Sequence, residues 1–85
     1  MKQICYRIRD PEGVHALPAG GLIKLAESFT CDITAEGNGK SVDAKHVFGL
    51  VGLGIQHGQT LTLTFEGEDE EEAARALERY LQGNL

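Results

Sequence analysis

The chain has 85 residues, enough for one small hydrophobic core, so a single domain over residues 1–85 is expected. Its formal charge of -5 at pH 7, with thirteen acidic against eight basic side chains, argues against general binding to nucleic acid or to an anionic membrane. No stretch reaches the roughly 18 apolar residues of a membrane span, and the first residues carry no export signal, which predicts a cytoplasmic protein without membrane insertion.

The first elements follow from hydrophobic periodicity. Residues 3–9 alternate between apolar and polar side chains, which is the period of a half-buried strand. The breaker cluster at 10–13 ends this strand, and apolar residues at helical spacing beyond it predict a helix over 16–28. Pro18 fits the first turn of that helix, because the N–H that proline lacks would have no partner there.

The middle of the chain is interpreted as a hairpin followed by a short helix. Residues 31–36 and 40–43 alternate, and the Gly-Asn-Gly segment between them tolerates positive φ, so a β-hairpin is expected. The apolar stretch 46–55 contains three glycines and predicts only a short helix. Cys5 and Cys31 have no CxxC spacing and are expected to be unpaired thiols, buried or half-buried.

The last third predicts one strand and one helix. Threonine alternates with large apolar residues over 60–65. Asp69 and Glu72 have the spacing of a capping box at the start of a helix that ends at Gly83. Because each strand has one apolar side, the predicted fold class is α+β: an open-faced βαββαβα sandwich, a four-stranded antiparallel sheet with three helices on one face.

His15 is the main candidate for chemistry. It lies between the breaker cluster and Pro18, so it is expected at a helix N-terminus. The unpaired backbone N–H groups of Ala16 and Leu17, with the positive end of the helix dipole, suit phosphate oxygens. Phosphoryl transfer at such a site asks for position and charge stabilisation, so no cofactor is expected. A surface histidine without a task is the alternative that position alone leaves open.

A resemblance to a known family supports this choice. The segment Gly13-Val14-His15-Ala16-Leu17-Pro18-Ala19 resembles the GxHARPA active-site motif of HPr, the phosphocarrier of the bacterial phosphoenolpyruvate-dependent sugar phosphotransferase system. Further segments match the family in order and spacing: 38–42, 44–45, 47–51, 53–55, 58 and 66–73. The resemblance implies the open-faced sandwich, His15 as phosphoryl acceptor, an enzyme I-like donor and an enzyme IIA-like acceptor. It also implies a partner-docking surface formed by Leu17, Gly20, Val47, Phe48 and Val51.

Three residues depart from the family pattern. Leu17 stands where the family has an arginine, so one charge-assisted hydrogen bond of about 1.5–3 kcal/mol to the phosphoryl group is absent. Glu12 would repel a phosphate if its carboxylate faced the histidine. His46 replaces the regulatory serine of Gram-positive members, so control by a serine kinase is not expected there. Lys24 and Lys45 are the basic side chains considered as substitutes for the arginine.

The sequence leaves three functions open. The first is a phosphocarrier, favoured by the retention of His15. The second is a regulatory module that keeps the HPr fold and docking surface, binds a regulatory partner and transfers phosphoryl groups weakly or not at all. Leu17, Glu12 and His46 favour it. The third, an unrelated small α+β ligand-binding or interaction domain, is disfavoured by the motif spacing.

Two further expectations concern the surface. A monomer is expected, because a carrier binds several partners in turn. No metal site is expected, because His46 and His57 lack the i, i+4 spacing of ligand pairs. The alternative to a docking surface is that about half of its apolar residues pack inward under the short helix.

Overall fold

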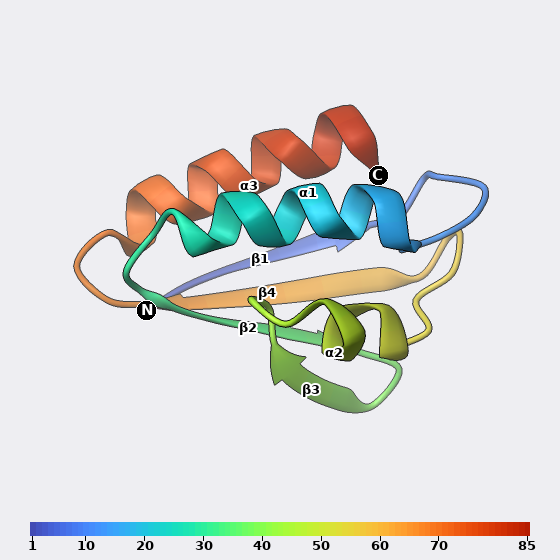
Figure 1. The fold of residues 1–85 in the computed structure, drawn as a ribbon, viewed down its shortest axis with the longest axis horizontal. Coiled ribbons are helices and arrows are strands. Elements are labelled where there is room, and N and C mark those ends of the chain that lie inside the picture. The colour runs from blue at the N-terminus through green and yellow to red at the C-terminus, as the bar shows by residue number, and fades with distance from the viewer.

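Four antiparallel strands form one sheet, and three helices lie on one side of it (Figure 1). The computed structural model describes residues 1–85. The elements in chain order are β1 (Lys2–Arg7), α1 (Ala16–Glu27), β2 (Asp32–Gly37), β3 (Lys40–Asp43), α2 (Val47–Gly52), β4 (Thr60–Glu66) and α3 (Glu70–Asn84). No helix among them combines the length and the apolar character needed to cross a membrane. The predicted α+β class and element order are confirmed.

The strands lie in the order β1-β4-β2-β3. The last strand of the chain is therefore in the interior of the sheet, where Leu63 of β4 is opposite Ile4 of β1 on one side and Ala35 of β2 on the other. Leu63 is fully buried, whereas Thr62 and Thr64 lie on the opposite side of the strand and are half-buried. The predicted division of this strand into an apolar and a hydroxyl-bearing side is confirmed.

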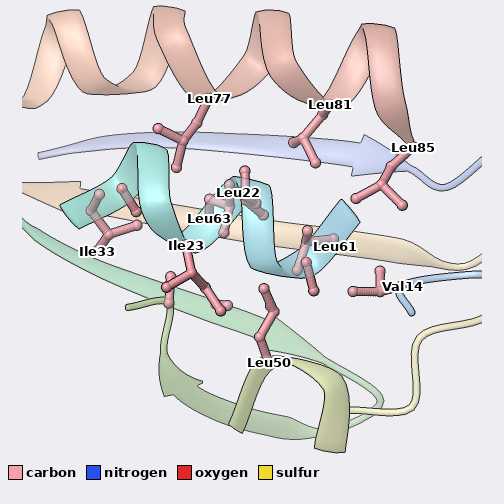
Figure 2. Packing of buried hydrophobic residues seen from close by; sticks show 14 of the residues in the cluster. Val14, Leu22, Ile23, Ile33, Leu50, Leu61, Leu63, Leu77, Leu81 and Leu85 are labelled. Atoms are coloured by element: carbon pink, nitrogen blue, oxygen red, sulfur yellow. The ribbon is translucent and has the colours of Figure 1, made fainter. Parts of the chain in front are cut away.

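The core lies between the sheet and the helices. Figure 2 shows Leu77 and Leu81 of α3 and Leu22 of α1 above the sheet, where Leu63 belongs to the same cluster. This cluster contains 21 buried residues, and no buried side-chain nitrogen or oxygen lacks a hydrogen bond. Val14, directly before His15, belongs to the cluster with 5% of its surface exposed. The core therefore holds the chain at the entrance to α1.

Asp69 is the N-cap residue of α3, as predicted, but the predicted capping box with Glu72 is wrong, because the Asp69 side chain makes no capping hydrogen bond. The Asp69 carboxylate instead accepts hydrogen bonds from the N–H groups of Thr30 (2.8 Å) and Cys31 (2.9 Å), directly before β2. The bond from the Thr30 N–H is the main cause that lowers the pKa of Asp69. The carboxylate thus joins two segments that are distant in the sequence, which local capping rules do not describe.

Most predicted ends shift by one residue, and two of the shifts have a tertiary cause. The last helix continues past Gly83 to Asn84, and Leu85 beyond it is buried. The main-chain oxygen of Leu85 accepts the N–H groups of Arg9 (2.6 Å) and Asp10 (2.9 Å). Since Arg9 donates to the end of α3 instead of to a neighbouring strand, β1 ends at Arg7 and not at residue 9.

The two thiols lie in different environments. Cys31 is buried, as expected, and burial raises its pKa to about 11. Cys5 is exposed, which corrects the prediction that both thiols are buried or half-buried. Its side of β1 faces away from the helices, and its Sγ lies 3.6 Å from the Thr62 hydroxyl. Neither cysteine is in a disulfide.

Candidate functional site

His15 is the N-cap residue of α1. Its backbone is extended (φ -104°, ψ 172°), and its carbonyl accepts the first helical hydrogen bond, from the Ala19 N–H at 3.1 Å. The side chain keeps 31% of its surface exposed, so the ring is accessible to another protein. The predicted place of His15 at a helix N-terminus is confirmed.

The loop before His15 is held by its own turn and by the loop before β4. Gly13 has φ +72°, and a Cβ there would lie 2.5 Å from the Ile55 carbonyl oxygen, so the position requires glycine. The Gly13 N–H donates to the Asp10 carbonyl and the Val14 N–H donates to the Ile55 carbonyl, each at 2.9 Å. These contacts set the direction in which the chain enters α1.

The first turn of α1 offers free backbone donors. The N–H groups of Ala16 and Leu17 donate to no acceptor in the protein, because a helix has no earlier turn to receive them. No side chain caps this end, and the first turn has no acidic residue. The predicted phosphate-binding N–H groups therefore lie beside His15 without an intramolecular acceptor, at the positive end of the helix dipole.

Asp10 is the nearest charged neighbour of the ring and was not among the predicted site residues. Its Oδ2 lies 3.3 Å from Nε2 of His15, and its Oδ1 accepts the Glu12 N–H at 2.8 Å. The bond from Glu12 is the main cause that lowers the pKa of Asp10. An ionised carboxylate can only accept, so a neutral His15 ring that hydrogen-bonds Asp10 does so through an Nε2–H group and leaves its lone pair on Nδ1.

The only sequence signal for this pair was an acidic residue five positions before the histidine. That spacing implies no contact by itself, because the two residues belong to no common helix or strand. The turn at Gly13 and the anchoring of Asp10 to Leu85 bring the side chains together.

Negative charge accumulates around the ring. A carboxylate oxygen of Asp10, a carboxylate oxygen of Glu12 and a ring nitrogen of His15 lie within 4.8 Å of one another. They form the only group of three or more His, Cys, Asp or Glu residues in the chain that lie close enough to hold a metal ion together. The Glu12 carboxylate therefore lies close to the His15 ring, which is the arrangement in which it was expected to repel a phosphate.

No basic side chain replaces the arginine that is absent at Leu17. Lys45 donates to two backbone carbonyls in the segment between α1 and β2, at 2.9 and 2.8 Å. Lys24 belongs to the last turn of α1, at the far end from His15. Arg9 adjoins Asp10 in sequence but donates to the Gln82 carbonyl at 2.7 Å. The polar groups near the ring are thus the carboxylates, the backbone N–H groups and the uncharged side chains of Tyr80 and Asn84.

The predicted docking residues come from α1 and α2, which pack against each other (Figure 1). Leu17 and Phe48 are 84% and 82% exposed, and Gly20 is also exposed. Val47 and Val51 are half-buried against the core, so the alternative of inward packing describes these two valines in part. Two large apolar side chains therefore remain at the surface, a feature common at protein-binding surfaces.

A shallow depression of about 270 Å³ adjoins His15. It is lined by Asp10, His15, Leu17, Pro18, Tyr80 and Asn84. This volume is at or below the low end of ordinary small-molecule pockets, roughly 300–1,000 Å³. The site has room for a phosphoryl group presented by another protein.

Comparison with known proteins covers nearly the whole chain. The family described as "PTS HPr component phosphorylation site" matches residues 2–83. The phosphocarrier protein HPr of Buchnera aphidicola subsp. Acyrthosiphon pisum (strain APS) is 44% identical over 77 residues, which are 91% of each chain. The structure of HPr-C-His from Thermoanaerobacter tengcongensis has a TM-score of 0.93 at 36% identity, covering 99% of this chain and 94% of that one. The Bacillus subtilis catabolite repression protein Crh, an intertwined dimer with a swapped domain, has a TM-score of 0.77 at 38% identity, covering 100% and 98%.

Proposed function

Because this chain belongs to the HPr family and is a phosphocarrier of the phosphotransferase system, we propose that His15 is the residue that carries the phosphoryl group. The observation that supports this most directly is the position of His15, a partly exposed N-cap residue beside the free N–H groups of Ala16 and Leu17. The family membership also removes the third hypothesis, an unrelated α+β domain.

The proposed reaction is a transfer between two imidazole rings. Nδ1 of His15 attacks the phosphorus of a phosphohistidine on the donor, and the new N–P bond forms as the donor N–P bond breaks. The N–H groups of Ala16 and Leu17 receive phosphoryl oxygens at the positive end of α1. In the second step a nucleophile of the acceptor attacks the phosphorus, and the N–P bond to Nδ1 of His15 breaks. Neither step needs a cofactor.

The proposed partners are an enzyme I-like donor and an enzyme IIA-like acceptor. We assign their docking to the surface formed by Leu17, Gly20, Val47, Phe48 and Val51. The exposure of Leu17 and Phe48 beside the histidine supports this, because an apolar surface loses water when a partner covers it.

Incubation with phosphoenolpyruvate and a general enzyme I tests the assignment. Intact-mass analysis at neutral and acidic pH should show an acid-labile gain of one phosphoryl group. The gain should vanish in His15→Ala and persist in His57→Ala, which removes another accessible histidine. An unmodified wild-type protein, under conditions that label an ordinary family member, would exclude phosphotransfer from this donor.

A second candidate is a regulatory docking module with weak or no phosphotransfer. Two observations together favour it: Leu17 is exposed in place of the arginine, and the carboxylates of Asp10 and Glu12 lie close to His15. Such a module would bind its partner equally well as wild type and as His15→Ala. Binding therefore does not separate the two candidates, and phosphoryl transfer to enzyme IIA does. A carrier transfers the group as wild type and loses the transfer in His15→Ala, whereas a docking module transfers little or nothing in either form.

A further inference from the structure

We propose that Asp10 is a positioning residue that orients His15, keeps the proton on Nε2 and supports the positive charge of the phosphorylated ring. This inference rests on the proposed function of His15. An arginine at position 17 would stabilise the phosphorylated state from the side of the phosphoryl group. In this chain the Asp10 carboxylate supplies part of that stabilisation from the opposite side of the ring.

Asp10 is itself held firmly enough to position another group. Its N–H donates to the main-chain oxygen of Leu85 (2.9 Å), its carbonyl accepts the Gly13 N–H (2.9 Å), and its Oδ1 accepts the Glu12 N–H (2.8 Å). Oδ2 is then directed at Nε2 of His15, at 3.3 Å. The Asp10 and His15 side chains are only 21% and 31% exposed, so water competes incompletely for this bond.

The chemistry of the pair follows from which nitrogen it engages. With the proton held on Nε2, the Nδ1 lone pair is free to attack, and the carboxylate fixes the orientation of the ring as it does for paired histidines in metal sites and hydrolases. After transfer the ring retains Nε2–H and carries a formal positive charge opposite Asp10. The proton therefore stays in place while the N–P bonds exchange. A bond of 3.3 Å has room to shorten towards the roughly 2.7–2.9 Å of a charge-assisted pair.

The opposing reading is that Asp10 only repels the incoming phosphoryl group. The two readings predict opposite signs. If repulsion dominates, removal of the Asp10 charge accelerates phosphorylation; if positioning dominates, it slows phosphorylation. Glu12 provides the matched comparison, since its carboxylate is close by but makes no hydrogen bond to the ring.

The first measurement is the tautomer of His15, from the ¹⁵N chemical shifts of Nδ1 and Nε2 in wild type, Asp10→Asn, Asp10→Glu and Glu12→Gln. Wild type should show mainly the Nε2–H form at a pH where the ring is neutral. Asp10→Asn should shift the population towards Nδ1–H, Asp10→Glu should restore it at least partly, and Glu12→Gln should leave it unchanged. A wild-type tautomer population in Asp10→Asn overturns the proposal, whether or not the protein is ever phosphorylated.

The second measurement is the single-turnover rate of phosphorylation by enzyme I. Asp10→Asn should lower the rate by about 10- to 100-fold, with little change in KM. This is the usual effect of removing a carboxylate that hydrogen-bonds a functional histidine. Glu12→Gln should keep or raise the rate. A faster reaction in Asp10→Asn would show that repulsion prevails. Failure of the proposed function is recognised separately, because it would leave wild type unphosphorylated while the tautomer still responded to Asp10.

Discussion

The hydroxyl of Tyr80 in α3 donates a 2.7 Å hydrogen bond to the carbonyl of Pro18 in the first turn of α1, three residues after His15. Gly21 allows this approach, because a Cβ at that position would overlap the Tyr80 hydroxyl. The half-buried setting of Tyr80 raises the pKa of its phenol, so it stays a donor at neutral pH. The α3 helix thus fixes the segment of α1 that carries the candidate site.

Replacement of either residue should destabilise the fold. Tyr80→Phe is expected to lower the free energy of unfolding by about 0.5–1.5 kcal/mol, the value of one hydrogen bond. Gly21→Ala should cost about 1–3 kcal/mol through overlap with the hydroxyl. In Tyr80→Phe the overlapping oxygen is gone, so the double variant should lose less than the sum of the two. Urea denaturation of the four proteins measures this coupling, and strict additivity would contradict it.

Introduction of the family's arginine at position 17 should strengthen the carrier. Leu17→Arg is expected to increase the stability of the phosphorylated form relative to the free protein by about 10- to 100-fold, the equivalent of one charge-assisted hydrogen bond. The phosphoryl-transfer equilibrium with enzyme I is the measurement. Leu17→Gln is the matched control, because it removes the same apolar contact without adding charge. An equal response of both variants would rule out the electrostatic explanation.

Phe48 should matter for partner binding and not for folding. Phe48→Ser changes a side chain that is 82% exposed, so its effect on the free energy of unfolding should be within about 0.5 kcal/mol. The KM of enzyme I for this variant should rise, because the docking surface loses an apolar contact. Leu50→Ala, on the same helix but fully buried, should instead cost about 2–5 kcal/mol. A normal KM for Phe48→Ser would place the docking surface elsewhere.

Asp69 should make stability depend on pH in the acid range. Its pKa in the folded protein is below the ordinary 3.8, so its contribution is present above that pH and is lost as the pH falls through the folded value. Asp69→Asn should therefore be less stable than wild type at neutral pH and should lose less stability below about pH 4. Thermal unfolding across this range tests it, with the exposed neighbour Glu68→Gln as control. Parallel curves for wild type and Asp69→Asn would disprove the role.

Hydrophobic periodicity, glycines and proline predicted the local structure from the sequence. Alternation identified the strands, and apolar residues at helical spacing identified α1 and α3. The histidine could be placed at a helix N-terminus because its determinants, the breaker cluster and Pro18, are adjacent to it. These features depend on interactions within a few residues, so they are readable without a structure.

Contacts between segments distant in sequence were decided only by the tertiary structure. The insertion of β4 between β1 and β2, the attachment of Asp69 to Thr30, and the burial of Leu85 against the loop that holds Asp10 depend on the path of the whole chain. The same holds for the partner of His15. Asp10 is near it in sequence, but their contact exists because Gly13 turns the loop and Leu85 anchors it. The sequence alone thus determined where the candidate site begins, and the tertiary structure determined which charges surround it.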